Sequence, residues 1–346
     1  MNYVTPEYSV VIITANGTKY YVKKMGSKTS NIVISLTLDE PDGQLAQKAE
    51  VTLANIKIAG DQGGFPASLF KVKSRVFIYA KGAGKTKSTE VFRGFVWENR
   101  YSNKNEKEVT LTCYDHLIYL MKSETSRYFS KGKSTKTIMK AICKSWGIKL
   151  SYSYYSITHP KLPLSGTIAD VIMSDILDKV KEKKGKKYVI RSQKDRMYIK
   201  TVGKNDPFYI IDNGGRGISL GYTRTTTMED MVTKVIITGK TAKSGKVKVA
   251  AKVNSKNKKK YGTLQKVINK DEDTKLKTVK KEAKNILKEN QSPKTTYEVP
   301  ALDVPWLHKG DKVGVCFSGT TITNCIVKSI THEATEGTMM MEVYKI

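Results

Sequence analysis

The segment from Glu108 to Met121 changes its hydrophobic period at one point, and this switch limits the folds open to the chain. Apolar side chains alternate with polar ones from Val109 to Cys113, which is the period of a half-buried strand. They then gather at helical spacing from Leu117 to Met121. We therefore expect a sheet that ends in a short helix covering its end. Such a seam is typical of a small barrel with a lid and not of an enzyme cleft.

Residues 1–125 predict a first tube-like β-barrel, because short β-type segments recur there with turn signals between them. Asn16-Gly17 is a strong hairpin dipeptide, and Pro41-Asp42-Gly43 ends the strand before it. About six or seven strands suit a small antiparallel barrel. The expected strands are Val10–Thr14, Lys19–Val22, Asn31–Leu38, Val51–Ile58, Arg75–Ala80, Val91–Tyr101 and Val109–Tyr114.

Residues 126–205 change to helical spacing and predict a small α+β insert. A Ser or Thr before an apolar stripe can accept the first free helical N–H groups, and glycine favours the end of a helix. The first expected helix begins at Ser134 or Thr135 and ends at Gly147. The second has an apolar stripe from Ile168 to Val180 and follows a capping-box variant, Thr167 with Asp170. A hairpin of strands 188–191 and 197–200 comes after it.

Residues 206–346 return to strands and predict a second tube-like β-barrel with one helix at about 275–288. The fold class is thus mainly β with an α+β insert and two tube-like antiparallel β-barrels per chain. Two such domains suggest a duplicated unit, although no residue-level repeat is visible. The expected strands of the second barrel are Ile218–Thr225, Met231–Thr238, Val247–Val253, Val313–Phe317, Thr321–Ile330 and Met339–Tyr344.

The net charge of +29 raises the possibility of nucleic-acid binding. The middle part is the most basic, with 19 basic against 5 acidic residues, and 53 of the 61 basic residues of the chain are Lys. Arg recognises phosphates and bases with two parallel hydrogen bonds, whereas Lys is a hydrated point charge. A basic nucleic-acid-binding β-protein therefore stays as the alternative function. The excess of positive charge implies an anionic binding partner, either an acidic protein surface or a polyanion that passes by.

The sequence shows no apolar run near the ~18 residues of a membrane helix, and Met1 to Tyr20 lacks the order of a signal peptide. We expect synthesis in the cytosol and no membrane insertion. The cysteines and histidines are scattered, so buried thiols are favoured over metal ligands and no cofactor is expected. They are Cys113, Cys143, Cys316, Cys325, His116, His159, His308 and His332.

Two glycine-rich stretches imitate nucleotide-binding loops. Gly82–Thr86 ends like a phosphate-binding loop, but Tyr79 stands where its first glycine belongs, and the stretch lies between two strands. Asp212–Gly217 precedes a strand and lacks an acidic partner at dinucleotide spacing. An exposed hairpin and a domain-linking turn are the simpler interpretations.

Hydrolytic chemistry finds little support in the sequence. No Ser lies in a GxSxG motif, and no Cys lies in a sequence like that around the papain nucleophile. The carboxylate pairs Asp170 with Asp175 and Glu229 with Asp230 keep a cell-wall hydrolase open as a third function. Helix-surface and turn positions explain these pairs more simply, so we expect no catalytic residue and no enzyme.

The segment from Lys240 to Lys260 is basic without one acidic residue. Val247, Val249 and Val253 interleave as on a strand, which predicts a projecting hairpin and a solvent loop. The lysines either protect a solvated strand edge against aggregation or form an interaction hairpin. They are Lys240, Lys243, Lys246, Lys248, Lys252, Lys256, Lys258, Lys259 and Lys260.

Several short motifs, taken in order, resemble baseplate hub proteins of contractile phage tails and phage-tail-like bacteriocins, the XkdQ/YqbQ and late-control-D type. The resemblance covers nearly the whole chain. Its first motif, 109–123, matches the end of the first barrel in those proteins. The others are 137–148, 185–190 before a hairpin, 261–264 before a helix, 308–313, 326–332 and 339–343.

The resemblance implies a non-enzymatic structural hub. It implies a homotrimer whose two barrels per chain form a pseudo-sixfold ring between a sixfold tail tube and a threefold central spike. The implied partners are the tail tube protein, the spike protein and other baseplate proteins, with a tape-measure protein as a further candidate and no specific nucleic acid. The implied location is the baseplate of a phage tail or bacteriocin. Neither the Gly310–Asp311 turn nor His332 on the following strand demands catalysis.

Overall fold

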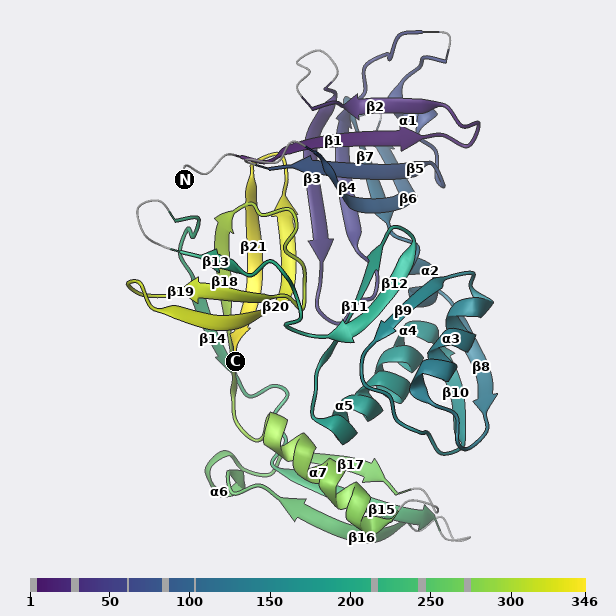
Figure 1. Cartoon of the computed structure of the whole chain (residues 1–346). Helices are drawn as coiled ribbons and strands as arrows, with labels where there is room; N and C mark the ends of the chain where they lie inside the picture. Colours follow the sequence, from purple (N-terminus) through teal and green to yellow (C-terminus); the bar gives the residue numbers. More distant parts are fainter. Residues whose placement is uncertain are drawn as a thin grey trace.

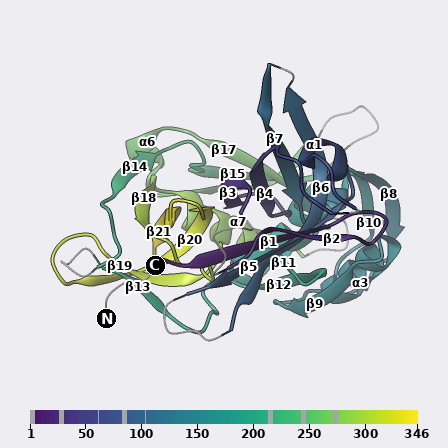
Figure 2. The same ribbon diagram turned by 90° about the horizontal axis from the view of Figure 1, so that it is seen from above.

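The computed structural model describes residues 5–25, 31–60, 62–82, 87–102, 104–212, 217–241, 247–270 and 275–346. It contains two β-domains, an insert with helices, and a small unit built on the helix α7 (Figure 1). Seen from above, the second β-domain lies on one side of the molecule and the insert on the other (Figure 2). In the ranges given, no helix is long and apolar enough to cross a membrane.

The first β-domain is an antiparallel sheet in the order β2-β1-β5-β6-β7-β4-β3. Its alternating apolar residues face inward as expected, and the switch near Cys113 places the short helix α2 directly after β7. Its strands are β1 (Glu7–Ile13), β2 (Lys19–Lys23), β3 (Val33–Glu40), β4 (Lys48–Ala54), β5 (Arg75–Lys81), β6 (Thr89–Ser102) and β7 (Asn105–Tyr114), and its helices are α1 (Pro66–Leu69) and α2 (Ile118–Met121).

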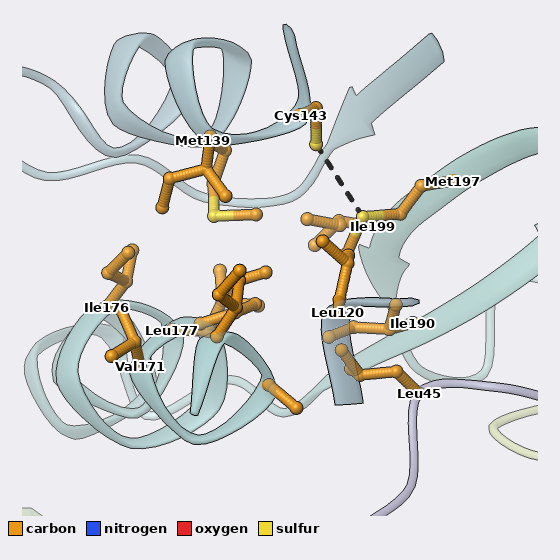
Figure 3. Packing of buried hydrophobic residues seen from close by; sticks show 14 of the residues in the cluster. Leu45, Leu120, Met139, Cys143, Val171, Ile176, Leu177, Ile190, Met197 and Ile199 are labelled. Carbon is orange, nitrogen blue, oxygen red and sulfur yellow. Dashed lines mark hydrogen bonds between the residues drawn. The ribbon is translucent and has the colours of Figure 1, made fainter. Parts of the chain in front are cut away.

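The insert packs its helices on two small sheets, and Figure 3 shows their shared apolar core, where Cys143 lies 3.7 Å from the sulfur of Met197. Leu45 and Leu120 of the first β-domain enter the same core. The elements are β8 (Glu124–Phe129), α3 (Thr135–Ser145), β9 (Lys149–Ser153), β10 (Leu162–Thr167), α4 (Ile168–Asp170), the π-helix η1 (Val171–Leu177), α5 (Asp178–Lys184), β11 (Tyr188–Gln193) and β12 (Arg196–Thr201).

Of the two helix caps predicted in the insert, one is confirmed and one is wrong. The Ser134 hydroxyl accepts the Thr137 N–H and caps α3, as predicted. Thr167 makes no side-chain cap, so the predicted capping box is wrong. The Ile168 N–H instead donates to the Ser123 carbonyl 2.9 Å away. A tertiary hydrogen bond thus replaces the local cap.

The second β-domain has the strand order β14-β18-β21-β20-β19-β13, with β13 and β14 at its two edges. Its core is formed by valines, isoleucines and methionines that alternate along these strands. The strands are β13 (Tyr209–Ile211), β14 (Thr223–Thr227), β18 (Lys294–Leu302), β19 (Lys312–Cys316), β20 (Ile322–Glu333) and β21 (Thr338–Lys345).

A separate unit, which we call the α7 unit, lies between β14 and β18 in the sequence. Two strands predicted for the second barrel, β15 and β16, belong instead to its own sheet, in the order β16-β15-β17. The reason is that the apolar stripe of α7 packs on Val235 and Ile237 of β15. Together they form an apolar core separate from those of the two β-domains. The elements are β15 (Lys234–Thr241), β16 (Val247–Asn254), α6 (Lys258–Tyr261), β17 (Gln265–Asn269) and α7 (Leu276–Asn290).

The strand β20 joins the two β-domains into one sheet of 13 strands. Its last residues, Ile330 to Glu333, pair antiparallel with residues 37–40 of β3. The mainly β class with an α+β insert is therefore confirmed. Within the described strands, β2 approaches the start of β3 through a single bridge between Lys23 and Asn31, so the closed tube form stays a prediction. The boundaries at 125/126 and 205/206 also stay predictions.

The two glycine-rich stretches lie mostly outside the described residues. Gly82 directly follows β5, and the ring of Trp306 lies over it. Residues 83–86 and 213–216 are not described, so the hairpin and linker interpretations stay predictions.

The close contact at Gly94 in β6 gives a test of the first β-domain. A Cβ there would lie 2.2 Å from the Tyr114 carbonyl oxygen, so Gly94→Ala forces β6 away from β7. We expect a loss of about 1–3 kcal/mol of unfolding free energy, measured by urea denaturation. Gly239→Ala in β15 is the matched control, because its nearest contact would be 3.7 Å away. An equal effect of the two substitutions would contradict this packing.

Candidate functional site

The residues from Asp303 to Asp311 connect β18 to β19, and we call them the junction loop. This loop lies where the first β-domain, the insert and the second β-domain meet. Although it is a loop, its polar side chains are buried: Asp303 is 1% exposed, Asp311 4% and Lys309 7%. Buried charges of this kind are stable only when they are paired and hydrogen-bonded.

The first β-domain contacts the junction loop through Glu40, the last residue of β3. One Glu40 carboxylate oxygen lies 2.5 Å from His308 Nδ1, and the other accepts the backbone N–H of Lys309 at 3.3 Å. The Lys309 ammonium in turn donates to the carbonyl of Gln44 at 2.6 Å. The end of β3 and the chain reversal after it therefore bind both the backbone N–H and the side-chain ammonium of Lys309.

The insert contacts the same loop through β11. The Arg191 guanidinium donates to Asp311 Oδ1 at 2.7 Å, and its Nε donates to the Lys309 carbonyl at 2.7 Å. Gly310 has a φ of +78°, and a Cβ there would lie 2.7 Å from the Val189 side chain. Glycine is thus required both for the turn and for the close approach of β11.

A second buried cluster lies at the start of the loop. Tyr8 of β1 donates to Asp303 Oδ2 at 2.5 Å, and His332 Nδ1 lies 2.6 Å from Asp303 Oδ1. His332 Nε2 lies 3.1 Å from the Leu307 carbonyl oxygen. Because both ring nitrogens face oxygen acceptors, the geometry requires two N–H groups and hence an imidazolium. In agreement, Asp303 raises the pKa of His332 against the opposing effect of burial.

The charges of the junction influence one another strongly. Burial alone raises the pKa of Glu40, but His308, Arg191 and Lys309 outweigh it and lower that pKa to about 2. Burial lowers the pKa of Lys309. Asp115, at the end of β7, accepts the N–H groups of Gln47 and Leu117, yet burial raises its pKa to about 7. Glu40 therefore stays ionised and, together with Asp311, balances the cations of the junction.

The two histidines of the junction differ in exposure, because the His308 side chain is partly exposed and His332 is buried. A cavity of about 330 Å³ borders it, lined in part by Arg191, His308 and Lys309. His308 pairs with Glu40 through Nδ1 and lines this cavity. His332, whose carboxylate partner is Asp303, is 1% exposed and uses both ring nitrogens in hydrogen bonds. A general base needs a free nitrogen within reach of a substrate.

The structure places the predicted basic residues on the α7 unit. Lys248 and Lys252 lie exposed on β16, which pairs with β15 as a hairpin. Lys256 is exposed before α6, and Lys258, Lys259 and Lys260 form most of that one-turn helix. Lys243 and Lys246 lie outside the described residues, as does the Lys240 side chain. Between residues 231 and 290 the sequence has 18 lysines, no arginine and five acidic residues.

The other candidate residues do not converge on one place. Asp170 is exposed on the insert, and the exposed Asp230 forms an ion pair with Lys294 at 3.2 Å, with Glu229 beside it. All four cysteines are buried free thiols, as expected. In the part of the chain that the structure describes, no three His, Cys, Asp or Glu side chains are grouped as metal ligands.

Sequence reasoning missed most of the junction. It identified the Gly310–Asp311 turn and His332, but not Glu40, Arg191 or Asp303. The one local signal for Glu40 is its position before Pro41-Asp42-Gly43, at the end of a strand. Nothing in that signal indicates a partner 268 residues away.

Glu40 gives the junction a testable response to acid. Its folded pKa of about 2 lies below the ordinary 4.5, so its contribution is complete above pH 4.5 and is lost as the pH falls towards 2. We expect this group to account for on the order of 3 kcal/mol of the unfolding free energy lost between pH 5 and pH 2. Glu40→Gln should be less stable at pH 7 and should lack that part of the acid response in urea titrations.

The matched control is Glu50→Gln, because Glu50 is a partly exposed residue of β4 that forms an ion pair with Lys48. It should keep the wild-type acid response. A Glu40→Gln protein with the full wild-type response would show that the junction does not depend on this carboxylate.

Comparison with known proteins places the chain in a family. A family model described as YQBQ-like matches residues 67–344. A curated relative, the uncharacterized protein YqbQ of Bacillus subtilis (strain 168), is 27% identical over 184 residues. That alignment covers 52% of this chain and 54% of the relative, so the match spans about half the length of YqbQ.

Solved structures share the fold at low sequence identity. A tail protein from Neisseria meningitidis MC58 is 12% identical with a TM-score of 0.67, covering 98% of this chain and 96% of that one. The 43 kDa tail protein of prophage MuSo2 from Shewanella oneidensis is 13% identical with a TM-score of 0.64, covering 97% and 98%. The E. coli c3393 protein, a component of the type VI secretion system, is 8% identical with a TM-score of 0.52, covering 94% and 76%. With a family match over most of its length and the fold of these proteins, the chain belongs to the YQBQ-like family.

Proposed function

We propose that the protein is a non-enzymatic structural hub in the baseplate of a contractile injection particle, either a phage tail or a bacteriocin. The observation that carries this proposal is the YQBQ-like match over residues 67–344 together with the fold shared with phage tail proteins. The tail tube protein, the spike protein and other baseplate proteins are its expected partners, with a tape-measure protein as a further candidate. The protein would be made in the bacterial cytoplasm and assembled into the particle.

Symmetry gives the physical reason for two β-domains in one chain. Three copies that each supply two similar domains present six positions around an axis while keeping threefold symmetry. Such a trimer can join a sixfold tube to a threefold spike. The continuous sheet through β20 and β3 supports this proposal, because the spacing of the six positions would be set within each chain.

Strand β13 lies at a sheet edge among the described strands and offers a contact between copies. It pairs with β19 on one side, and Phe208, Ile210 and Ile322 beside it are 43%, 45% and 48% exposed. Phe208 and Ile322 both lie over Gly314, the partner of Ile210 in the strand pair. An exposed apolar group at an open edge is a contact that a second copy can cover.

A trimer is the first test of the hub. Native mass spectrometry of the full chain should give a species at three times the 38.7 kDa mass. Ile210→Lys should shift the population towards monomer, because it places a charge in the apolar contact. Val267→Lys is the control, since Val267 is 52% exposed on the α7 unit, away from both β-domains. A monomer for the wild type at micromolar concentration, or a different closed ring, would contradict the trimer.

The basic surface of the α7 unit supports a second proposal, an interaction hairpin for an acidic protein partner. None of the six described lysines, Lys248, Lys252, Lys256, Lys258, Lys259 and Lys260, has an ion-pair partner in the described parts of the chain. Lysine without arginine favours general attraction over base recognition. Nucleic-acid binding is the competing function.

Charge removal separates these two functions. Replacing Lys252, Lys256, Lys259 and Lys260 by Gln should weaken binding to poly-glutamate several-fold, measured at two salt concentrations. The control replaces the four exposed lysines of α3 and its N-terminal side, Lys133, Lys136, Lys140 and Lys144. Random-sequence duplex DNA should bind weakly and dissociate as salt rises. Tight, sequence-selective DNA binding at physiological salt would favour the nucleic-acid function instead.

A further inference from the structure

The sheet of the α7 unit is covered by a helix on one face only. α7 lies over the face formed by Val235, Ile237 and Ile268, whose side chains are buried in the core of the unit (Figure 1). Because side chains alternate along a strand, the neighbouring residues Ile236 and Val267 point to the opposite side. We call this opposite side of the sheet the outer face.

An apolar strip crosses the outer face. Ile236 lies beside Val267 in the parallel pair of β15 with β17. On β16, Ala250 is the extra residue of a bulge, so Val249 points to the outer face, as does Val247 two residues earlier. Val247, Val249 and Val267 are 46%, 46% and 52% exposed. No element of the described chain therefore covers the strip.

Lysines border this strip without acidic residues beside them. Lys252 is the partner of Ile236 in the strand pair, and Lys234 stands two residues before Ile236, so both belong to the outer face. The strands β15, β16 and β17 contain five lysines and no Asp or Glu. The outer face thus combines an apolar strip with positive charge that the strands themselves do not balance.

The covered face of the same sheet shows what fits such a surface. α7 buries Val279, Ala283 and Ile286 against the strands and is polar on its other side. A second amphipathic helix can pack on the outer face in the same way and place a helix on both sides of the sheet. On the outer face its polar flanks meet lysines, so complementary flanks carry Asp and Glu.

Other occupants match the outer face less well. A second copy of the α7 unit would set lysines against lysines. Duplex DNA presents phosphates to the lysines and would leave the valines uncovered. Helices and anchors that bind anionic lipid surfaces use Trp, Phe and Leu, whereas the strip contains only Val and Ile.

We propose that the outer face of the α7 unit binds an acidic amphipathic helix of a partner protein. Ile236, Val249 and Val267 contact the apolar stripe of that helix, and Lys234 and Lys252 attract its acidic flanks. The site rests on the acidic partner proposed above for the basic surface of the α7 unit, and it adds the face that makes contact and the shape of the partner.

Binding of a designed peptide to the full-length protein tests this site. The striped peptide has about 18 residues, with Leu at positions i, i+3, i+4 and i+7, Glu on both flanks and Ala elsewhere. A scrambled peptide of the same composition keeps the charge and loses the stripe. We expect the striped peptide to bind about tenfold more tightly than the scrambled one at about 0.15 M salt, measured by fluorescence anisotropy.

A pair of valine substitutions separates the strip from the charge. Val249→Thr with Val267→Thr keeps β-branched side chains and removes apolar surface. It should weaken binding of the striped peptide about three- to tenfold and change poly-glutamate binding less than about twofold. The matched control is Ile56→Thr with Val72→Thr, at loop residues of the first β-domain that are 56% and 57% exposed. It should change neither affinity.

Charge reversal covers the case in which the valine variant folds poorly. Lys234→Glu with Lys252→Glu should weaken binding of the striped peptide. The same variant should bind a striped peptide with Lys in place of Glu more tightly than the wild type does, which a merely damaged sheet would not do.

The site is ruled out if the striped and scrambled peptides bind equally, or if the valine variant keeps full affinity for the striped peptide. Poly-glutamate binding would in that case leave the acidic partner standing, and its absence would remove both. Tighter binding of the same valines to phosphatidylserine vesicles or to duplex DNA than to the striped peptide would also overturn the helix site.

Discussion

The pairing of β20 with β3 is the contact on which the arrangement of this molecule depends. One edge of β20 pairs with β19 over its first half and with β3 over its last residues. A strand that belongs to two sheets at once makes them one sheet, so the β-domains cannot rotate independently without breaking backbone hydrogen bonds. The pairing also brings Glu40, the partner of Ile330, to the junction loop.

The buried charges of the junction add selectivity to this backbone contact. Leaving one member of a buried pair alone costs about 3–5 kcal/mol, so displaced arrangements are disfavoured. Glu40 with His308, Arg191 with Asp311, and His332 with Asp303 are all satisfied together in one arrangement of the three parts. These charge pairs fix the geometry of the junction more strictly than an apolar contact, which tolerates sliding.

The α7 unit follows a different principle. Its core of seven buried apolar residues is its own, and its contact with the insert is polar, with Asn285 donating to the Glu182 carbonyl and Lys181 close to Glu289. Polar contacts between separately packed units allow movement more readily than a shared core. The molecule thus combines two β-domains joined in one sheet with a unit that contacts the insert through polar side chains.

Many of the local elements could be predicted from the amino-acid sequence alone. Period-two alternation predicted β1 to β7, the Ser134 cap predicted α3, and the apolar stripe predicted α7. These features are local, because hydrophobic period and capping depend on residues within a few positions of each other. Family motifs in order along the chain also indicated the YQBQ-like family, since the motifs are themselves sequence features.

Which elements pack together depends on contacts between residues far apart in the sequence. The alternation of Val235 and Ile237 suits a barrel strand and the α7 sheet equally well, and the core under α7 settled the choice. Glu40 and His308 lie 268 residues apart, and Tyr8 and Asp303 lie 295 apart. A charged residue looks the same in sequence whether it is solvated or buried with a partner. The distinction depends on distances and on excluded water, which exist only once the chain is folded.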